Sequence, residues 1–566
     1  MTNWSLRVLG ILLILSCGPA LQAESPGPRI EIAFSGDVSA KPLDGRVLLA
    51  ISNVLRGEPR FQISPFPGSQ LIFGVDVEAL KPGQKVAIDA DVLGYPIDSV
   101  ADIPPGKYRA QAVLHIYETF HRADGHVLKL PMDHWEGQQW NRSPGNLYSV
   151  PVDIEISGEN GQRIEILMDQ IMPDRPPVEE TEYVKYDRFE SPRLSRFWGR
   201  RMEMGVIVLL PDGWSEHPEA RYPLVIHHGH FPSGPFNFRE SPPSDDMTGN
   251  ARRYAEAGYE WYRQWTSANY PRAVVIWIQH PTPYYDDSYA VNSANNGPYG
   301  DAITYDLIPF IEKKYHCIGE PWARVMHGGS TGGWISLAVQ VFYPDDYNGC
   351  WAYCPDPVDF RWFQTFNVYE SKNAYYLPSP WKKIDLPLAR TTTGVVLTTY
   401  ESYNRLERVL GSHGRTGEQM GIFQAVFGPT DDEGYPRPLW DPATGDIDPD
   451  TAEYWKKYDI GRILREDWGT LGPKLAGKMH IYMGDMDTFY LNNAAHLLED
   501  FLKSAKDPAF EGTIAFRERM PHCWTGNAEG SAAEGSLDLY IRMFPEMIDH
   551  ILKTAPDGAD TTSWRY

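Results

Sequence analysis

Four apolar runs in the second third of the chain are the feature that most constrains its fold. Segments of longer, helix-like pattern separate them, and the run at 273–278 is apolar throughout, which is typical of strands buried on both faces of a parallel sheet. Strands that alternate with helices indicate βαβ units, so residues 176–555 are predicted to form an α/β domain with a mostly parallel sheet. The runs occupy residues 204–210, 224–226, 273–278 and 324–326.

Residues 25–175 follow a different pattern, in which short alternating strands are broken by turn signals. At 566 residues the chain exceeds what one hydrophobic core usually organises, so a second folded unit is expected. The short strands predict an all-β, sandwich-like N-terminal domain, which either binds a polymer or braces the rest of the chain. A Pro- and acid-rich stretch at 172–182 cannot sustain a helix or a central strand, and marks the boundary.

A serine flanked by glycines follows the last of the four apolar runs. Residues 327–333 read His-Gly-Gly-Ser-Thr-Gly-Gly, and a helical pattern follows at 334–339. A nucleophilic serine needs a strained turn between a strand and a helix, where glycines let the neighbouring backbone pass close by. We therefore predict that Ser330 is a nucleophile; the alternative is that the glycine run is only a flexible turn.

An acid and a base for this serine are expected further along the chain. Residues 479–483 resemble a strand and lead to Asp485 and Asp487, and a hydrolase of this type places its acid just past a late strand. Asp487 is the predicted acid, with Asp485 as its rival. His522 follows the last predicted strand at 512–516 and is the predicted general base, because it completes the chain order Ser, Asp, His.

Acyl transfer also needs backbone N–H groups that stabilise the developing oxyanion. One donor is expected at Thr331, directly after the nucleophile, and the other in the histidine-rich turn after 224–226, at His230 or Phe231. The three histidines of this turn match no helical ligand spacing, and no cysteine pair completes a zinc site. Neither a metal nor another cofactor is therefore expected.

These motifs resemble those of a group of bacterial esterases that includes esterase D, enterochelin esterase and feruloyl esterase. The similar segments are Tyr222-Pro-Leu-Val-Ile-His-His-Gly, Asn296-Gly-Pro-Tyr-Gly with the helix that follows it, and Gly-Gly-Ser-Thr-Gly-Gly. The resemblance covers residues 180–553 and implies the α/β-hydrolase fold and hydrolysis of carboxylic esters through an acyl-enzyme.

Residues 360–474, here called the insertion, depart from the compact members of that group. They separate the strand that ends at Tyr353 from the one that begins at Met479, and we expect them to fold over the site as a cap. Asp356 and Asp359, just past the first of these strands, are further alternatives for the triad acid. The cap would carry the aromatic residues Trp362, Phe363, Tyr375, Tyr376 and Trp381.

The N-terminus has one early positive charge, an apolar run at 8–15 and a small residue at Ala23, which is typical of a secretory signal peptide. We therefore expect residues 1–23 to be removed and the protein to be periplasmic or secreted; a lipid anchor at Cys17 is the lesser alternative. No other stretch is apolar enough to span a membrane.

A net charge of −23 argues against nucleic acids and anionic membranes as partners. The expected partner is a small-molecule or polysaccharide-linked ester. One alternative is a serine peptidase, since the triad does not by itself separate esters from amides. Another is a non-catalytic binding protein on a hydrolase scaffold, which is the weakest because all three triad positions are occupied. Oligomeric state stays open, as does disulfide pairing, since the four later cysteines permit one bridge without requiring it.

Overall fold

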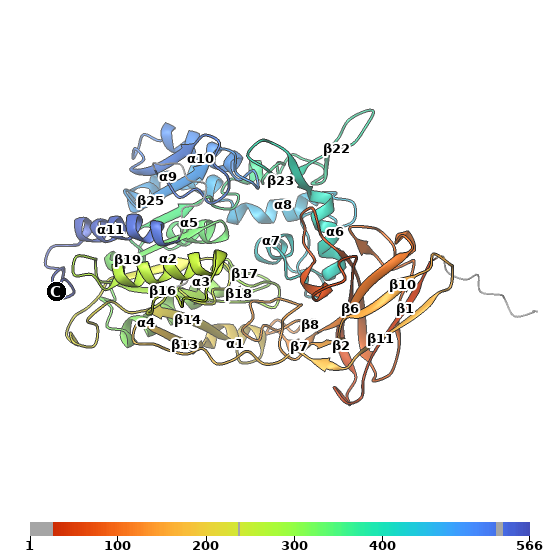
Figure 1. Ribbon diagram of the computed structural model, residues 1–566. Coiled ribbons are helices and arrows are strands. Elements are labelled where there is room, and N and C mark those ends of the chain that lie inside the picture. Colours follow the sequence, from red (N-terminus) through yellow and green to blue (C-terminus); the bar gives the residue numbers. More distant parts are fainter. Residues whose placement is uncertain (1–26, 236–237, 528–535) are drawn as a thin grey trace, which may run out of the picture.

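The computed structural model describes residues 27–235, 238–527 and 536–566. The predicted signal peptide at 1–23 and Cys17 therefore lie outside the described residues. Figure 1 shows a β-rich N-terminal part on one side of the molecule and an α/β part on the other, with helices of the insertion between them.

Two sheets make up most of the N-terminal part. Their strand orders are β11-β1-β4 and β12-β9-β6-β2-β3-β5, and β10 pairs with β6. Apolar side chains from both sheets form one buried cluster, and the predicted alternation on β6 is found there, because Ala110, Ala112 and Leu114 all belong to it. The strands are β1 (Arg29–Phe34), β2 (Leu43–Ser52), β3 (Leu71–Leu80), β4 (Val86–Ile88), β5 (Gly94–Tyr95), β6 (Gly106–Ile116), β9 (Leu147–Tyr148), β10 (Val152–Ile156), β11 (Arg163–Met168) and β12 (Gln170–Ile171).

A hairpin from this N-terminal stretch packs on the α/β part instead. It consists of β7 (Glu118–His121) and β8 (Val127–Leu130). Its Phe120 ring lies against Trp198 at the end of α1 (Pro192–Trp198), with 5.3 Å between ring centroids, and both belong to the larger hydrophobic core. The two parts of the chain therefore share packed surface, although residues 173–182 between them have no regular structure.

The α/β part is built on an eight-stranded mixed sheet of order β13-β14-β16-β15-β19-β20-β25-β26. All pairs from β16 to β26 are parallel, and only the β13-β14 and β14-β16 pairs are antiparallel. The four apolar runs correspond to β14, β15, β16 and β19. The strands are β13 (Val184–Glu190), β14 (Glu203–Leu209), β15 (Leu224–His228), β16 (Val274–Gln279), β19 (Arg324–Gly329), β20 (Cys350–Tyr353), β25 (Met479–Gly484) and β26 (Gly512–Arg517).

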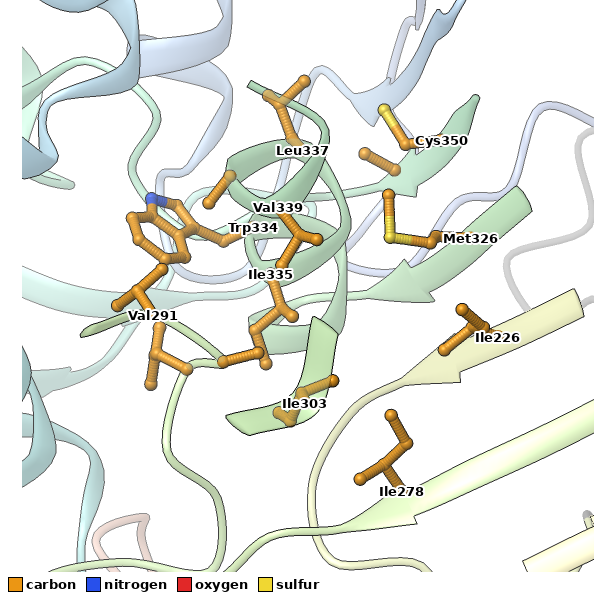
Figure 2. Packing of buried hydrophobic residues seen from close by; sticks show 14 of the residues in the cluster. Ile226, Ile278, Val291, Ile303, Met326, Trp334, Ile335, Leu337, Val339 and Cys350 are labelled. Carbon is orange, nitrogen blue, oxygen red and sulfur yellow. The ribbon is translucent and has the colours of Figure 1, made fainter. Parts of the chain in front are cut away.

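Helices cover this sheet, and α5 (Thr331–Phe342) lies at its centre. Figure 2 shows Ile335 and Val339 of α5 near Met326 of β19, while Trp334 extends toward Val291. The helix expected after Asn296-Gly-Pro-Tyr-Gly is a π-helical turn (Ala302–Leu307) flanked by α3 (Tyr299–Asp301) and α4 (Ile308–Lys314). The other layer helices are α2 (Gly249–Trp265), α9 (Ile460–Leu475), α10 (Asn492–Ser504) and α11 (Ser536–Thr554). None of the described helices is long and apolar enough to cross a membrane.

The insertion packs against both the α/β part and the N-terminal part of the chain. Its last helix, α9, connects β20 to β25 and contacts α5 and α10, so it is part of the α/β layers. Helix α6 contacts β3 and β5 of the N-terminal sheet, where the Arg46 Nε–H donates to the Val409 carbonyl at 2.7 Å. Helix α6 spans Tyr400–Leu410, and the remaining elements are β21 (Tyr376–Leu377), β22 (Ile384–Asp385), β23 (Pro387–Arg390), β24 (Val396–Thr399), α7 (Gln419–Phe427) and α8 (Pro449–Trp455).

The aromatic residues of the insertion that were expected over the site do not lie there. Phe363 and Tyr375 are buried in the main core, whereas Trp381 is 93% exposed, between β21 and β22. Figure 1 shows the loop beside β22 projecting away from the molecule. An aromatic side chain in an insertion serves packing as readily as binding, so composition alone did not identify the residues that face the site.

Candidate active site

Ser330 lies on the turn that joins β19 to α5. Its φ of +57° and ψ of −123° fall outside the regions that residues with a side chain normally adopt. The glycines explain how such a turn fits: a Cβ on Gly332 would lie 2.0 Å from the His228 carbonyl oxygen, and one on Gly328 would lie 2.5 Å from the same atom. Strained residues of this kind cluster at active sites, where the surroundings hold them in place.

Asp487 and His522 form a buried pair. The His522 Nδ1 lies 2.7 Å from Asp487 Oδ2, and the aspartate side chain is 0% exposed against 16% for the histidine. The other aspartate oxygen, Oδ1, accepts the N–H groups of Phe489 at 2.8 Å and Leu491 at 3.3 Å. Backbone therefore fixes one oxygen of the carboxylate, which directs the other oxygen at the imidazole.

The loop that carries His522 crosses over the end of β25 to reach the nucleophile turn. Gly484, the last residue of β25, has no room for a side chain, because a Cβ there would lie 2.3 Å from the Pro521 carbonyl oxygen. On the far side, the Sγ of Cys523 lies 3.7 Å from the position of a Cβ on Gly329. Cys523, the residue after His522, thereby lies beside the residue that precedes Ser330, although the two are far apart in the sequence.

The electrostatic surroundings favour the protonated form of His522. Burial alone would lower its pKa, but the Asp487 carboxylate and the neighbouring Cys523 outweigh burial and raise the pKa of His522 well above its usual value. A histidine that is hydrogen-bonded to a buried carboxylate through Nδ1 presents Nε2 as the atom that exchanges a proton.

The three alternative acids have partners of their own. Asp485 lies 2.9 Å from His496 Nε2 on α10, and Asp359 pairs with Arg361 at 2.8 Å. Asp356 accepts hydrogen bonds from the Tyr289 hydroxyl at 2.6 Å and the Thr331 hydroxyl at 3.1 Å, and burial raises its pKa. Geometry thus favours Asp487 among the four carboxylates.

The two candidates for the first oxyanion donor lie in different cavities. His230 lines the cavity that contains Ser330, whereas Phe231 lines a neighbouring cavity beside Trp135 and Gln279. The Phe231 N–H also donates to Asp286 at 3.4 Å. His230 therefore lies at the site, and Thr331, the second predicted donor, is fully buried beside it.

The cavity at Ser330 has a volume of about 160 Å³ and is enclosed by three parts of the chain. The N-terminal part contributes Pro65 and Phe66, and the ring centroid of Phe66 lies 6.4 Å from that of Phe489, which in turn packs edge-on against His522 at 5.0 Å. None of these wall residues was identified from the sequence, because nothing local marks them. The insertion contributes Gln364, Leu388, Tyr403, Gln419, Met420 and Phe423.

The three histidines predicted for one turn do not converge on one point, because His227 and His228 end strand β15 and only His230 lies beyond it. The His227 ring packs near Trp277, at 6.1 Å between centroids, and the His228 ring lies near His280 at 6.4 Å. His230 instead lies 3.2 Å from Asp286 and 3.6 Å from Asp287, and these carboxylates, acting against burial, raise its pKa. The neighbouring acids could have been suspected from the Asp-Asp pair in the sequence.

Two groups of side chains in the described part of the chain have the composition of a metal site. One is His230 with Asp286 and Asp287, and the other is His522 with Cys354 and Cys523. In the first, the protonated His230 imidazole already pairs with the Asp286 carboxylate, while burial raises the pKa of Asp287 well above its usual value. In the second, a metal would occupy the imidazole that the buried aspartate orients.

A mixed, mainly parallel sheet with a strained serine turn between a central strand and its helix defines the class, an α/β enzyme of the serine hydrolase type. Residues 200–458 match a family model described as putative esterase. This match agrees with the resemblance found in the sequence and supports an esterase.

Solved structures with a similar chain include esterases of low sequence identity. A ferulic acid esterase is 13% identical, with 65% of this chain and 98% of that chain covered and a TM-score of 0.37. An S-formylglutathione hydrolase from Agrobacterium tumefaciens is also 13% identical, with 66% and 97% covered and a TM-score of 0.34. No curated protein matches the sequence significantly.

Proposed function

We propose that Ser330, His522 and Asp487 form the catalytic triad of an esterase that works through an acyl-enzyme. The observation that carries the proposal is the 2.7 Å contact between Asp487 and His522, on a loop that reaches the strained serine turn. Asp487 holds the Nδ1 proton, so Nε2 accepts the proton of Ser330 as its Oγ attacks the ester carbonyl.

The remaining steps use the same groups. The N–H groups of Thr331 and His230 stabilise the negative charge on the carbonyl oxygen. Protonated His522 then gives its proton to the leaving alcohol, and afterwards it deprotonates the water that releases the acid from Ser330. The raised pKa of His522 fits this role, since the imidazolium must persist long enough to protonate the alcohol.

The size of the cavity supports a compact acyl group. A volume of about 160 Å³ is well below the roughly 300–1,000 Å³ of sites that enclose drug-sized ligands. The acyl group would lie against Phe423 and Leu388, while the alcohol extends toward solvent. This arrangement accommodates a small-molecule ester or one linked to a polysaccharide.

The insertion acts in this proposal as the cap, and the sandwich-like N-terminal domain as its brace. Leu406, Val409 and Leu410 of α6 pack in one buried cluster with Leu48 and Ile72 of the N-terminal sheet. That contact supports the wall in which Tyr403, one helical turn away, faces Ser330.

We also propose that the protein is exported, on the pattern of residues 1–23. N-terminal sequencing of the protein recovered from the periplasm or the medium should begin shortly after Ala23. Recovery of the full-length chain in the cytoplasm would contradict export. A lipid attached to Cys17 would show that the exported protein is anchored to a membrane.

A fluorophosphonate probe and a series of esters test the chemistry. The probe should label the wild type and an Ser504→Ala control, whose serine lies at the exposed end of α10, but not Ser330→Ala. Acetyl and propionyl esters should be cleaved faster than long-chain esters. Cleavage of peptide amides with no activity on any ester would favour the peptidase, and a folded protein that no probe labels would favour a binding role.

A further inference from the structure

Two cysteines meet beside the proposed triad. Cys354 directly follows β20, and Cys523 directly follows His522. Their Sγ atoms lie 3.1 Å apart, although 169 positions separate them in the chain. A disulfide has an S–S distance of about 2.05 Å, so roughly 1 Å of approach would join them.

The backbone at both cysteines is strained in the same sense. Cys354 has a φ of +38° and Cys523 a φ of +63°, in the left-handed region that residues with a side chain rarely adopt. Such conformations persist only where the surroundings hold them. Cys354 is buried and its N–H donates to the Tyr482 carbonyl at 2.7 Å, whereas Cys523 lies on an exposed loop, which needs another constraint.

We propose that Cys354 and Cys523 form a disulfide that fixes the His522 loop beside the nucleophile turn. The bond would link the end of β20 to the loop after β26, across the end of β25, where Gly484 leaves room for the loop to pass. His522 would then be held from two sides, by Asp487 through its ring and by Cys523 through the backbone.

The chemistry needs a disulfide-bearing oxidant, either a small molecule or a protein. The hydrogen bond from the Cys354 thiol lowers the pKa of Cys523, so the exposed Cys523 thiolate attacks a sulfur of the oxidant and expels one thiolate. Cys354 loses its proton and attacks Cys523 in the mixed disulfide, which expels the second. Two cysteine thiols are thereby oxidised by two electrons, and the oxidant leaves as two thiols.

Oxidation would also change the charge that faces His522. The groups around the imidazole are Asp487 after β25, Asp356 and Cys354 after β20, and Cys523 on its own loop. In the reduced protein Cys523 adds to the effect of Asp487 in raising the pKa of His522. A disulfide carries no charge, so the acidic limb of kcat/KM should lie at lower pH in the oxidised protein than in the reduced one.

Peptide mapping of the full-length exported protein tests the bond directly. After alkylation under denaturing, non-reducing conditions, peptides with Cys354 and Cys523 should be found linked, while buried Cys317 and Cys350 carry the alkyl label. Label on all four cysteines would overturn the proposal. So would stoichiometric zinc bound by a reduced protein, which would make Cys354, His522 and Cys523 a metal site.

Kinetics test the positioning role separately from folding. A phosphine reductant should lower kcat/KM of the wild type several-fold and move its acidic limb to higher pH. The double variant Cys354→Ala/Cys523→Ala should not respond to the reductant, and its melting temperature shows whether it folds. If the bond forms but its reduction changes neither activity nor the pH profile, the role in positioning His522 is wrong.

Discussion

The end of β25 carries two aspartates, each paired with a histidine, and the two pairs differ in almost every other respect. Asp487 and His522 are 0% and 16% exposed, whereas Asp485 and His496 are both 42% exposed. Backbone N–H groups hold the second oxygen of Asp487, while His496 is shared between Asp485 and Glu499. The aspartates stand only two residues apart in the chain.

The difference shows what sets the pair in the proposed triad apart from an ordinary ion pair. Exposed pairs are screened by water and contribute about 0–1 kcal/mol, and their side chains are free to reorient. A buried carboxylate whose orientation is set by backbone has one partner and one geometry, which is what a general base needs. Each of the following measurements tests whether this difference separates the two pairs.

The largest effect is expected from Asp487→Asn. The amide cannot hold the Nδ1 proton as the carboxylate does, so His522 presents the wrong tautomer, and kcat should fall by about 10⁴-fold. Steady-state kinetics on a short-chain ester measure the loss, and circular dichroism checks the fold. A loss below tenfold would mean that Asp487 is not the triad acid, with Asp356 as the next candidate.

The pH dependence of kcat/KM should reflect the titration of His522 in the buried pair. His522 must be neutral to accept the Ser330 proton, so activity should rise with pH through its pKa, which Asp487 and Cys523 raise. The midpoint should therefore lie above the ordinary histidine value of about 6.5 and move to lower pH in Asp487→Asn. If the midpoint shifts in Asp485→Asn instead, the pH dependence of kcat/KM comes from the exposed pair.

Phe66→Ala should affect the buried pair through its neighbour Phe489. Loss of the ring opens one wall of the cavity, and KM should rise by about tenfold, the lower end of what one apolar contact contributes to selectivity. Phe61→Ala is the matched control, because Phe61 is exposed on the same N-terminal part and does not line the cavity. Equal effects of the two substitutions would argue for general destabilisation.

Asp485→Asn should have the smallest effect. Because its ion pair with His496 is exposed, kcat/KM should stay within about twofold of the wild type and stability should change by less than about 1 kcal/mol. Ester kinetics and thermal unfolding measure both quantities. A large loss of activity with an unchanged melting temperature would give Asp485 a part in catalysis.

Much of the α/β part could be predicted from the sequence because its signals are local. The apolar runs predicted β14, β15, β16 and β19, and the predicted strands at 479–483 and 512–516 correspond to β25 and β26. The triad residues also carry local context, since each follows a strand at the edge of a parallel sheet where such residues meet. The strain at Ser330 is what the glycine pattern had indicated.

The cavity walls could not be predicted, because they depend on contacts between distant segments. Phe66 lines the cavity at Ser330 although it belongs to the N-terminal part, and no pattern around residue 66 records that contact. The cap aromatics were misplaced for the same reason. Cys354 and Cys523 carried a usable signal, since both directly follow predicted site elements at the carboxyl edge of the sheet.

Because Phe66 supplies one wall of the cavity at Ser330, the proposed triad and part of the surface that would contact a substrate come from separate stretches of the chain. A catalytic part excised at the linker would retain Ser330, His522 and Asp487 but would lose one side of its acyl chamber. Sequence drift in the loop around residue 66 can therefore retune which esters are accepted while the chemistry is inherited unchanged. For an engineer, that loop is the place to alter selectivity without disturbing the nucleophile.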